Sequence, residues 1–403
     1  MAFLRSYREP FRGLPRELWI LAAATLINRS GTMVLPFLAI YLTRELGTSA
    51  TRAGLVLAVY GAGAFVGILT GGRVADRLHP KPVQIASLAA SGVTIVALGA
   101  ARTEPAIFSL VAVTGFFAEA FRPANMASVA AHAPPELRTR AFALQRLAIN
   151  AGMTIGPAIG GFLATVDFAW LFRIDGATCL VAAVFLAVLL PGDVQSSEDE
   201  APRERPPSPL RDRLFVLVLL LLLPQGLVFM QVMSTMPLFL REERGMTEDA
   251  IGLLLAVNTI VILLTEMQVA RRAERSDPLF VMGISGLFIG VGFGVLPWAF
   301  GIPWLVASIL IWTVGEMLMG PVTASWVATR APEASRGAYM AWFTLTFAIV
   351  NIFGPWIGTA VLEHFGSTAL WLSTLAIGVL DLAAFWILAR ALRARAGPVP
   401  QST

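Results

Sequence analysis

The sequence predicts an all-α integral membrane protein in which twelve transmembrane helices form two parallel six-helix bundles. Three observations lead to this fold class: an apolar composition, twelve hydrophobic segments of membrane-spanning length, and an internal repeat that relates the two halves of the chain. Hydrophobic residues make up 56% and charged residues 14% of the 403 positions, whereas soluble domains carry about 25% charged residues. Most of the protein surface is therefore expected to face lipid.

The twelve segments follow from the thickness of the bilayer. A helix needs roughly 20 mostly apolar residues to cross a hydrocarbon core of about 30 Å. In the first half, such segments are predicted at 18–43, 52–72, 83–101, 105–130, 141–165 and 168–191. In the second half, they are predicted at 214–240, 249–270, 279–300, 303–328, 338–362 and 368–391. The first segment is too long for a cleaved signal peptide, so we expect it to be a permanent helix.

The basic residues indicate the orientation. With Arg390, at the end of the last segment, counted with the C-terminus, the termini and the even-numbered loops together hold 21 of the 30 Lys and Arg residues, whereas the odd-numbered loops hold five and the spans four. By the positive-inside rule, both termini are expected to be cytoplasmic. Because the basic residues follow the membrane side and form no single patch, the sequence pI near 9.8 does not indicate a nucleic acid partner. We expect a multi-pass protein of the cell membrane, which is the inner membrane in a Gram-negative source.

A polar stretch separates the two halves. Residues 192–213 are rich in Ser, Pro, Glu and Arg and are predicted to form a flexible cytoplasmic linker. It divides the chain into an N-terminal bundle, 1–191, and a C-terminal bundle, 214–403. At a constant offset of 198 residues, the loop 73–80 aligns without gaps with the loop 271–278. Chance similarity of apolar helices would not preserve charged loops, and six helices separate equivalent positions, so the repeat is parallel.

A charged loop between the second and third segments, a weaker copy between the eighth and ninth, and two parallel halves resemble the major facilitator superfamily. The resemblance covers essentially the whole chain. The loop pattern of this family is matched by Gly72, Asp76, Arg77 and Lys81. The loop departs from the pattern at His79 and Pro80, where the family has glycine and a basic residue. The resemblance implies a solute transporter that works by alternating access.

The same loops imply a cytoplasmic gate. In the resemblance, Asp76 docks on the start of the eleventh helix, and Glu274, beside Arg275, docks on the start of the fifth. Helix N-termini attract carboxylates because their N–H groups are unpaired and carry the positive end of the helix dipole. Alternatively, these are ordinary loop charges that support orientation. The recurrence of the carboxylates in both halves favours the gate, since orientation depends chiefly on Lys and Arg.

The fifth segment combines small residues with a proline. The pattern consists of Gly152, Gly156, Pro157, Gly160 and Gly161. It resembles the signature of proton-driven drug antiporters of the superfamily, in which a bent fifth helix packs against the eighth and limits leakage. The alternative is generic packing of small residues, which a degenerate copy at Gly354 and Pro355 supports. Val111 stands where these antiporters often have an arginine.

Ionisable residues at membrane depth are costly and are therefore functional candidates. Glu316 and Glu119 are the expected proton carriers, because they fall near mid-membrane and a buried carboxylate can be switched by a nearby arginine. The expected charge partners are Arg29, Arg122 and Arg146. Alternatively, Glu119 and Arg122 form a static ion pair on one helix face. Asp381 and Glu266 are expected to be structural.

A substrate cavity is predicted from polar and aromatic residues within the spans. Its expected lining is Asn28, Gln225, Gln231, Asn258, Trp312, Phe343, Phe347 and Asn351. For each amide, an interhelical hydrogen bond worth about 1 kcal/mol is the alternative role. The single cysteine, Cys179, allows no intramolecular disulfide. Since the sequence contains no phosphate-binding loop and no zinc motif, we expect no cofactor, no metal and no catalytic residues.

Taken with the resemblance, these features predict a secondary active transporter that exports amphipathic small molecules in exchange for protons. A facilitator for a specific metabolite, lipid or peptide is the main alternative, and a membrane enzyme or receptor without transport is the other. The expected partners are a small-molecule substrate, protons and the lipid bilayer, and we expect a monomer. An enzyme is not expected, because loops repeated in both halves suit alternating access and a catalytic pocket does not need them.

Overall fold

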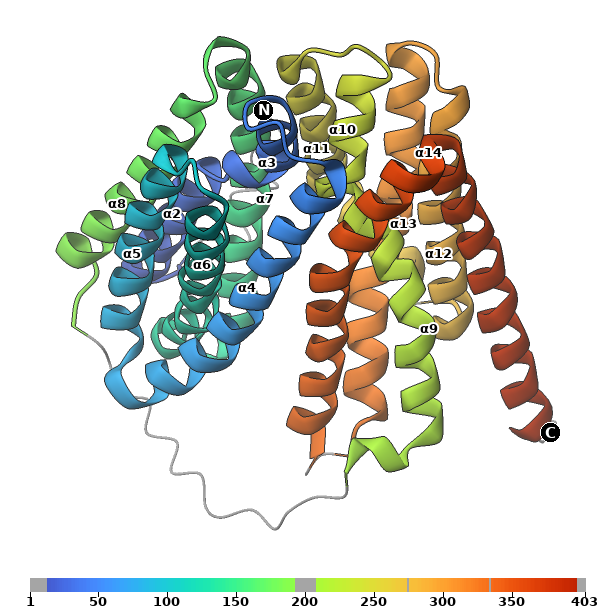
Figure 1. Cartoon of the computed structure of the whole chain (residues 1–403). Coiled ribbons are helices and arrows are strands. Elements are labelled where there is room, and N and C mark those ends of the chain that lie inside the picture. Colours follow the sequence, from blue (N-terminus) through green and yellow to red (C-terminus); the bar gives the residue numbers. More distant parts are fainter. Residues whose placement is uncertain (1–12, 193–207, 274, 333–334, 397–403) are drawn as a thin grey trace, which may run out of the picture. The chain divides into compact units, whose positions relative to one another are not determined.

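The computed structural model describes residues 13–192, 208–273, 275–332 and 335–396, except for the side chains at positions 76, 135, 139, 336, 395 and 396. Figure 1 shows that the regular structure of these residues is helical. Most of the linker predicted at 192–213 lies outside the described residues. The chain forms two compact units, which we call unit 1 (Met1–Asp199 and Met236–Leu263) and unit 2 (Glu200–Thr235 and Leu264–Thr403). The bundle boundaries drawn from the sequence stay a prediction.

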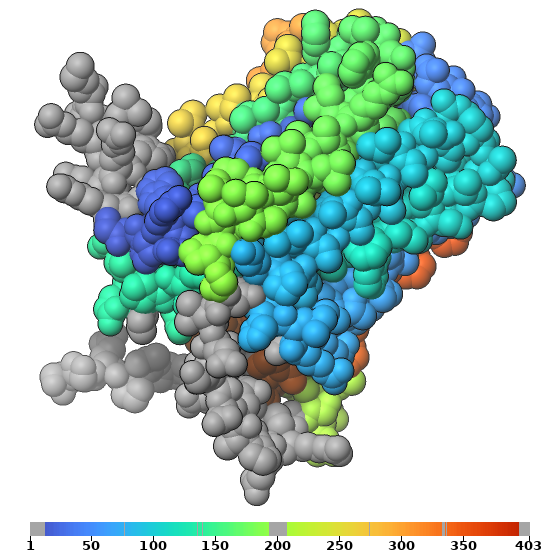
Figure 2. All heavy atoms as spheres, turned by 90° about the vertical axis from the view of Figure 1, so that its left-hand side faces the viewer, coloured from blue at the N-terminus to red at the C-terminus, as the bar shows by residue number. Residues whose placement is uncertain are grey.

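Unit 1 contains most of the N-terminal half. Its helices are α2 (Arg16–Ser30), α3 (Val34–Arg44), α4 (Ala50–Leu78), α5 (Pro80–Ala100), α6 (Glu104–His132), α7 (Arg138–Val166), α8 (Ala169–Leu189), most of α10 (Thr235–Glu242) and the first part of α11 (Glu248–Ala273). Helix α4 packs along α6, α5 along α6 and α8, and α2 along α7 and α8. Figure 2 shows α5 and α8 side by side on one face of this unit.

Unit 2 contains the remaining helices. They are α9 (Arg213–Phe229), the end of α11, α12 (Pro278–Gly294), α13 (Ile302–Arg330) and α14 (Arg336–Ala396). Helix α12 packs against α13 and α14, and α14 also packs against α9. Short 3-10 turns are η2 (Pro135–Leu137) in unit 1 and η3 (Pro209–Arg211), η4 (Met230–Met233) and η5 (Leu296–Trp298) in unit 2.

The prediction of a twelve-helix membrane protein is confirmed. In the described residues, eleven helices are long and apolar enough to cross a membrane. The last of them, Gly337–Ala394, contains both final predicted segments, because Gly366 interrupts α14 with φ 82° and ψ 167°. Glycine has no Cβ atom and adopts these angles without a steric penalty. This one residue therefore separates the eleventh span from the twelfth.

Two predicted spans are divided in the structure. The first is interrupted between α2 and α3, and the seventh is interrupted at η4, between α9 and α10. A proline lacks the N–H group of the helix ladder, and its ring clashes with the carbonyl group four residues earlier. Pro36 stands four residues after Thr32, and Pro237 stands four residues after Met233. The prolines thus explain why each helix restarts at a new N-terminus.

The internal repeat is also visible in the backbone. Gly47 and Gly245, which are equivalent at the 198-residue offset, have φ angles of 65° and 62°. Pro123 and Pro321 stand at the same offset, and they lie inside α6 and α13. The two halves therefore share local conformations as well as residue types.

The loop between α4 and α5 turns at His79, with φ 69° and ψ 149°. Glycine adopts this region readily, whereas other residues are strained there. Pro80 then begins α5 at a position where its missing N–H group is not needed. His79 thus holds a glycine-like conformation at the position where the sequence departs from the family pattern.

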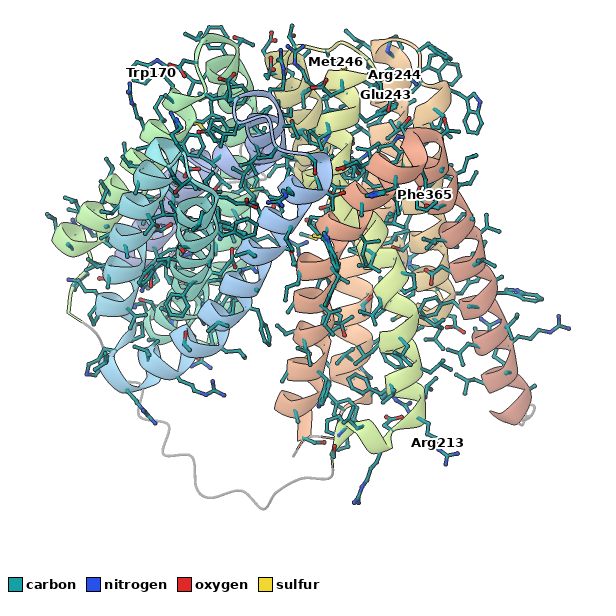
Figure 3. The ribbon with its side chains drawn as sticks, viewed as in Figure 1. Trp170, Arg213, Glu243, Arg244, Met246 and Phe365 are labelled. Atoms are coloured by element: carbon teal, nitrogen blue, oxygen red, sulfur yellow. The ribbon has the colours of Figure 1, made fainter. Side chains whose placement is uncertain are left out.

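Large apolar side chains are exposed on the helices. Phe365 and Val188 are each 74% exposed, and Trp170 is 43% exposed; Figure 3 labels Phe365 and Trp170. In water, a large apolar surface favours association with other molecules. Such a surface suits a protein whose solvent is the hydrocarbon core of a bilayer.

Candidate functional site

Helix α7 carries the glycine and proline pattern predicted for the fifth segment. One face of this motif helix packs against the break between α2 and α3, which is residues 31–33. A Cβ atom on Gly152 would lie 2.5 Å from Cβ of Arg29, and one on Gly156 would lie 2.9 Å from the carbonyl oxygen of Thr32. One on Gly160 would lie 2.9 Å from Cβ of Met33. These distances leave no room for a larger side chain. The three glycines therefore allow α7 to lie directly on the backbone of the break.

A second face of α7 packs against α11. Gly161 lies against the backbone of Glu248, and Gly252 on α11 lies against the carbonyl group of Pro157. Helix α11 corresponds to the eighth predicted segment. The close contact is compatible with the antiporter resemblance and equally with generic packing, so the role of α7 as a barrier to leakage stays a prediction.

Asp175 on α8 caps the first turn of α3 at the break. Its Oδ2 atom accepts hydrogen bonds from the backbone N–H groups of Met33 and Val34, at 3.2 and 3.1 Å. The first amides of a helix have no partner within the helix, and a carboxylate is favourable beside them. Asp175 is only 6% exposed. Asp175 was not among the residues predicted from the sequence, although, like Glu119, it is an acidic residue inside an apolar span.

Glu119 on α6 lies between two arginines. Its carboxylate oxygens are 3.9 Å from Nη2 of Arg29 and 3.5 Å from Nη1 of Arg122. The side chains of Arg29 and Glu119 are 17% and 16% exposed, whereas that of Arg122 is 56% exposed. The structure thus brings together three of the charged residues that the sequence singled out. Whether Glu119 carries protons stays a prediction.

Arg29 and Asp175 line one cavity of about 50 Å³ inside unit 1. The other polar residues of its lining are Asn28, Thr32, Tyr60, Ser91, Thr114 and Cys179. Nδ2 of Asn28 donates a hydrogen bond to Sγ of Cys179, at 3.3 Å. A buried water needs about 10 to 15 Å³ of such space and two to four polar partners. The cavity therefore suits a few water molecules, and it is too small for an amphipathic substrate.

The other predicted charged residues lie elsewhere. Glu316 is half-buried on α13 in unit 2, and Arg146 is exposed on α7 in unit 1. Glu266 is half-buried on α11. Asp381 on α14 is 5% exposed, and Gly286 on α12 leaves the space that its carboxylate fills. The roles expected for these residues from the sequence stay predictions.

Two amides of the predicted substrate cavity make interhelical hydrogen bonds. Gln225 donates to Oγ of Ser285 at 2.6 Å, which joins α9 to α12. Nε2 of Gln231 donates to the carbonyl oxygen of Gly354 at 3.0 Å, which joins η4 to α14. Such bonds favour the packing role over substrate binding for these two residues.

The aromatic candidates lie in unit 2. Trp312 is 1% exposed and stacks on Phe293 with 5.5 Å between the ring centroids. Phe343 and Phe347 line a separate cavity of about 20 Å³. Asn351 donates to the carbonyl oxygen of Phe347 within its own helix, and Asn258 is buried on α11 of unit 1. Their contribution to a substrate cavity stays a prediction.

The predicted cytoplasmic gate is described only in part. Glu274 and the side chain of Asp76 lie outside the described residues. Nζ of Lys81 donates to the carbonyl oxygen of Leu190 at 2.6 Å, which ties the start of α5 to the end of α8. The remaining gate residues are Gly72, which is half-buried, and Arg77 and Arg275, which are exposed. The gate therefore stays a prediction.

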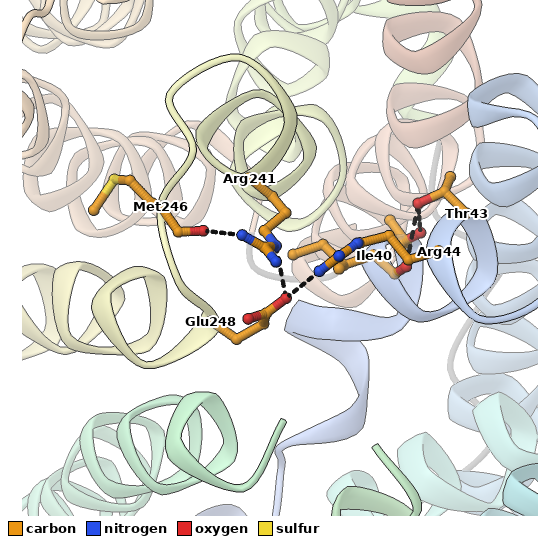
Figure 4. Close-up of polar contacts among 7 residues, drawn as sticks. Ile40, Thr43, Arg44, Arg241, Met246 and Glu248 are labelled. Atoms are coloured by element: carbon orange, nitrogen blue, oxygen red, sulfur yellow. Dashed lines mark hydrogen bonds and ion pairs between the residues drawn. The ribbon is translucent and has the colours of Figure 1, made fainter. Parts of the chain in front are cut away.

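A second charged cluster, which the sequence analysis did not predict, surrounds Glu248 (Figure 4). Oε1 of Glu248 lies 2.8 Å from Nε of Arg241 and 3.1 Å from Nη1 of Arg44. Arg241 also donates to the carbonyl oxygen of Met246 at 2.9 Å. Glu248 begins α11, and its side chain is 6% exposed. Since Arg44 belongs to the first sequence half, the cluster joins residues of both halves within unit 1.

Outside the spans, Asp212 is held as an anion at the start of α9. Its carboxylate accepts two hydrogen bonds of 2.7 Å from Arg330 and one of 3.2 Å from the N–H group of Phe215. Burial by itself raises the pKa of Asp212, but Arg330, this N–H group and the hydroxyl of Tyr339 lower it. The net pKa lies below the ordinary value of 3.8.

Several related proteins align with most of this chain. The chain is 27% identical over 362 residues to the uncharacterized MFS-type transporter YqjV of Bacillus subtilis (strain 168), covering 87% of each protein. It is 25% identical to a Na(+), Li(+), K(+)/H(+) antiporter of Planococcus maritimus, covering 82% of this chain and 85% of that one. It is 26% identical to the multidrug resistance protein MdtH of Escherichia coli O1:K1, covering 84% of each.

A solved structure and a family model agree on the fold. The nucleoside transporter NupG matches with a TM-score of 0.77 and 15% identity, over 93% of this chain and 99% of that one. The Major Facilitator Superfamily model matches residues 18–248 and 214–402. Its members are transporters and not enzymes. The chain therefore belongs to the major facilitator superfamily and is a multi-pass secondary transporter.

Proposed function

We propose that this transporter exports amphipathic small molecules in exchange for protons, by alternating access. The observation that carries the proposal is the cluster in which Glu119 lies between Arg29 and Arg122 within the membrane-spanning segments. A carboxylate in such a place has a desolvation cost, and carboxylates of this kind typically bind ions or protons. Arg29 and Arg122 place two positive charges beside this carboxylate.

The direction of coupling is supported by two relatives. The Planococcus maritimus protein is named as a cation/H(+) antiporter, and MdtH is named for multidrug resistance. The close packing of α7 on α11 is compatible with antiport, with which the resemblance associates this contact. We therefore propose antiport, with Glu119 and Glu316 as proton carriers and a small-molecule substrate.

A facilitator of one metabolite is the second candidate. The match to a nucleoside transporter concerns the fold alone at 15% identity, and it does not favour that substrate class here. Charged residues kept within the spans favour coupled transport over simple facilitation. We further propose that the cytoplasmic gate forms around Asp76 and Glu274, and that the transporter is a monomer.

The test is proton flux in proteoliposomes under an imposed pH gradient. Ethidium serves as the cationic probe and a dicarboxylate as the anionic probe, with wild type, Glu119→Gln and Glu316→Gln in parallel. The control is Glu104→Gln, because Glu104 pairs with Arg52 where both side chains are more than half exposed. We expect ethidium to drive opposing proton movement in wild type and in the control.

Each variant decides a separate part of the proposal. Loss of coupling in Glu119→Gln or Glu316→Gln identifies that residue as a carrier. Substrate movement that is equal with and without the gradient in wild type contradicts antiport and favours the facilitator. Preference for the dicarboxylate contradicts the proposed substrate class.

A further inference from the structure

The buried carboxylate of Asp175 has a desolvation cost that an uncharged helix cap would avoid. Serine, threonine and asparagine also cap helix N-termini, and they do so without a charge. A carboxylate that is 6% exposed inside a membrane-spanning helix requires compensation for its desolvation. Capping alone therefore does not explain why an ionisable residue stands at this position.

The two oxygens of Asp175 have different surroundings. Oδ2 accepts both backbone N–H groups at the start of α3. The contact of Oδ1 is with Sγ of Cys179 at 4.0 Å, which is the outer limit for a weak sulfur hydrogen bond. Oδ1 is thus the oxygen that can take up a proton while Oδ2 continues to accept from the backbone.

The cavity connects this carboxylate to the charged cluster. Asp175 and Arg29 both line it, and so does Thr114, which is 5% exposed. In the described residues, the hydroxyl of Thr114 has no hydrogen-bond partner. A buried polar group of this kind normally bonds to water. The cavity therefore provides polar groups for a short chain of waters that can deliver a proton.

We propose that Asp175 binds a proton during the transport cycle, and that its protonation loosens the start of α3 at the break between α2 and α3. This inference rests on the proposed proton coupling and adds a carboxylate that acts beside Glu119.

The effect on the break follows from the strength of the bonds. Hydrogen bonds to a charged acceptor are roughly twice as strong as those to a neutral one, so protonation weakens the cap at Met33 and Val34. The same break lies directly under Gly152, Gly156 and Gly160 of α7. A shift at the start of α3 is thereby transmitted to the motif helix.

The charges around Asp175 make protonation dependent on the cluster. The titratable and charged groups near Asp175 are Arg29 on α2, Tyr60 on α4 and Cys179 on α8 itself, and Glu119 on α6 pairs with Arg29. Helix α3 contributes its backbone amides, and α5 contributes Ser91. With Arg29, Arg122, Glu119 and Asp175 all ionised, the net charge of these four residues is zero. A proton on Asp175 leaves an excess of one positive charge among these four residues.

The first test does not depend on the substrate. Infrared spectra of the purified protein are recorded between about pH 5 and pH 9, and the carbonyl stretch of protonated carboxylic acids is followed. We expect the titrating band of wild type to lose one component in Asp175→Asn. The matched control is Asp381→Asn, since Asp381 is an equally buried aspartate on α14, and this variant keeps the component that Asp175→Asn loses. A band in Asp175→Asn that is identical to the wild-type band overturns the inference.

The second test is transport of ethidium into proteoliposomes. Asn keeps an oxygen acceptor for both amides, so Asp175→Asn is expected to fold, and its ethidium exchange without a gradient is measured as the reference for uptake. Uptake driven by the pH gradient should fall about tenfold or more, which corresponds to 1.4 kcal/mol. If Asp175→Asn fails to fold, Asp175→Glu replaces it, and a shift of the infrared band assigns the group.

The two proposals fail in distinguishable ways. A wild-type protein that moves ethidium without protons contradicts the proposed function. A coupled wild type with an equally coupled Asp175→Asn contradicts only the role of Asp175. Equal loss of exchange and of gradient-driven uptake in a folded Asp175→Asn shows that the residue is a static cap.

Discussion

Arg44 at the end of α3 forms an ion pair of 3.1 Å with Glu248 at the start of α11, 204 residues further along the chain. Arg241 joins the same carboxylate oxygen at 2.8 Å. The carboxylate is nearly buried, whereas the side chain of Arg44 is 43% exposed. A buried anion with two cationic neighbours stabilises this part of unit 1 chiefly because its removal would leave Arg241 without a counter-charge.

Glu248→Gln should lower the free energy of unfolding by about 1 to 3 kcal/mol, because a buried charged hydrogen-bonding group loses its partner. Thermal unfolding in detergent measures the effect. Glu104→Gln is the control, since its pair with Arg52 has side chains that are 52% and 60% exposed, and exposed pairs contribute at most about 1 kcal/mol. Equal shifts for the two variants would show that the Glu248 cluster adds nothing beyond a surface pair.

Gly156→Ala should destabilise the contact between α7 and the break. The added Cβ atom would lie 2.9 Å from the carbonyl oxygen of Thr32 and 3.1 Å from that of Arg29, and backbone atoms cannot move away easily. Overpacking of this kind costs about 1 to 3 kcal/mol. Gly320→Ala on α13 is the control, because nothing lies within 4 Å of its Cβ position. An unchanged melting temperature for Gly156→Ala would mean that the helices separate without cost.

Asp212→Asn should reduce stability in a pH-dependent way. The pKa of Asp212 is lower in the folded protein than its ordinary value of 3.8, so ionised Asp212 stabilises the fold above pH 3.8. This contribution is lost as the pH falls through the lower, folded pKa. At neutral pH the loss should be about 1 to 3 kcal/mol, and it should shrink below pH 3.8. Unfolding measured at a series of pH values gives both quantities.

The control for Asp212 is Asp277→Asn. Asp277 caps α12 and accepts from Arg393 at 2.8 Å, but the side chain of Arg393 is 68% exposed. Water screens such a pair strongly, so the loss at neutral pH should be smaller. If the loss in Asp212→Asn does not change with pH, the effect comes from the cap geometry and not from the charge.

His79→Gly should stabilise the turn between α4 and α5 by about 1 kcal/mol, since glycine adopts a φ of 69° without strain. Gly301→Ala is expected to have the opposite sign, because Gly301 has a φ of 90°. Thermal unfolding of both variants checks the prediction. A lower melting temperature for His79→Gly would show that contacts of the imidazole outweigh the backbone strain.

The membrane architecture was predictable because its signals are local. Each span is recognisable from about 20 consecutive residues, whatever the rest of the chain does. The breaks after α2 and α9 were missed, although Pro36 and Pro237 mark them, because a hydrophobicity window averages over a proline. The division between the last two spans, at Gly366, was predicted correctly because a polar turn separates the two apolar segments.

The candidate site was predictable only in its residue types. Glu119, Arg29 and Arg122 stood out because charges are rare within apolar spans. Asp175 met the same criterion, but its partners are backbone amides of α3, more than 140 residues earlier. No spacing of residues in the sequence predicts a hydrogen bond to a backbone group on another helix.

The sequence by itself determined the number of membrane spans, the parallel repeat, the family and the charged residues that lie within the spans. Only the tertiary structure decided that α7 lies on the break between α2 and α3, that Asp175 caps α3, and that Arg44 meets Glu248. The physical reason is that hydrophobicity and charge are properties of single residues, whereas the partner that compensates a buried charge comes from helix packing. A sequence therefore shows which groups need a partner in lipid, and the fold supplies it.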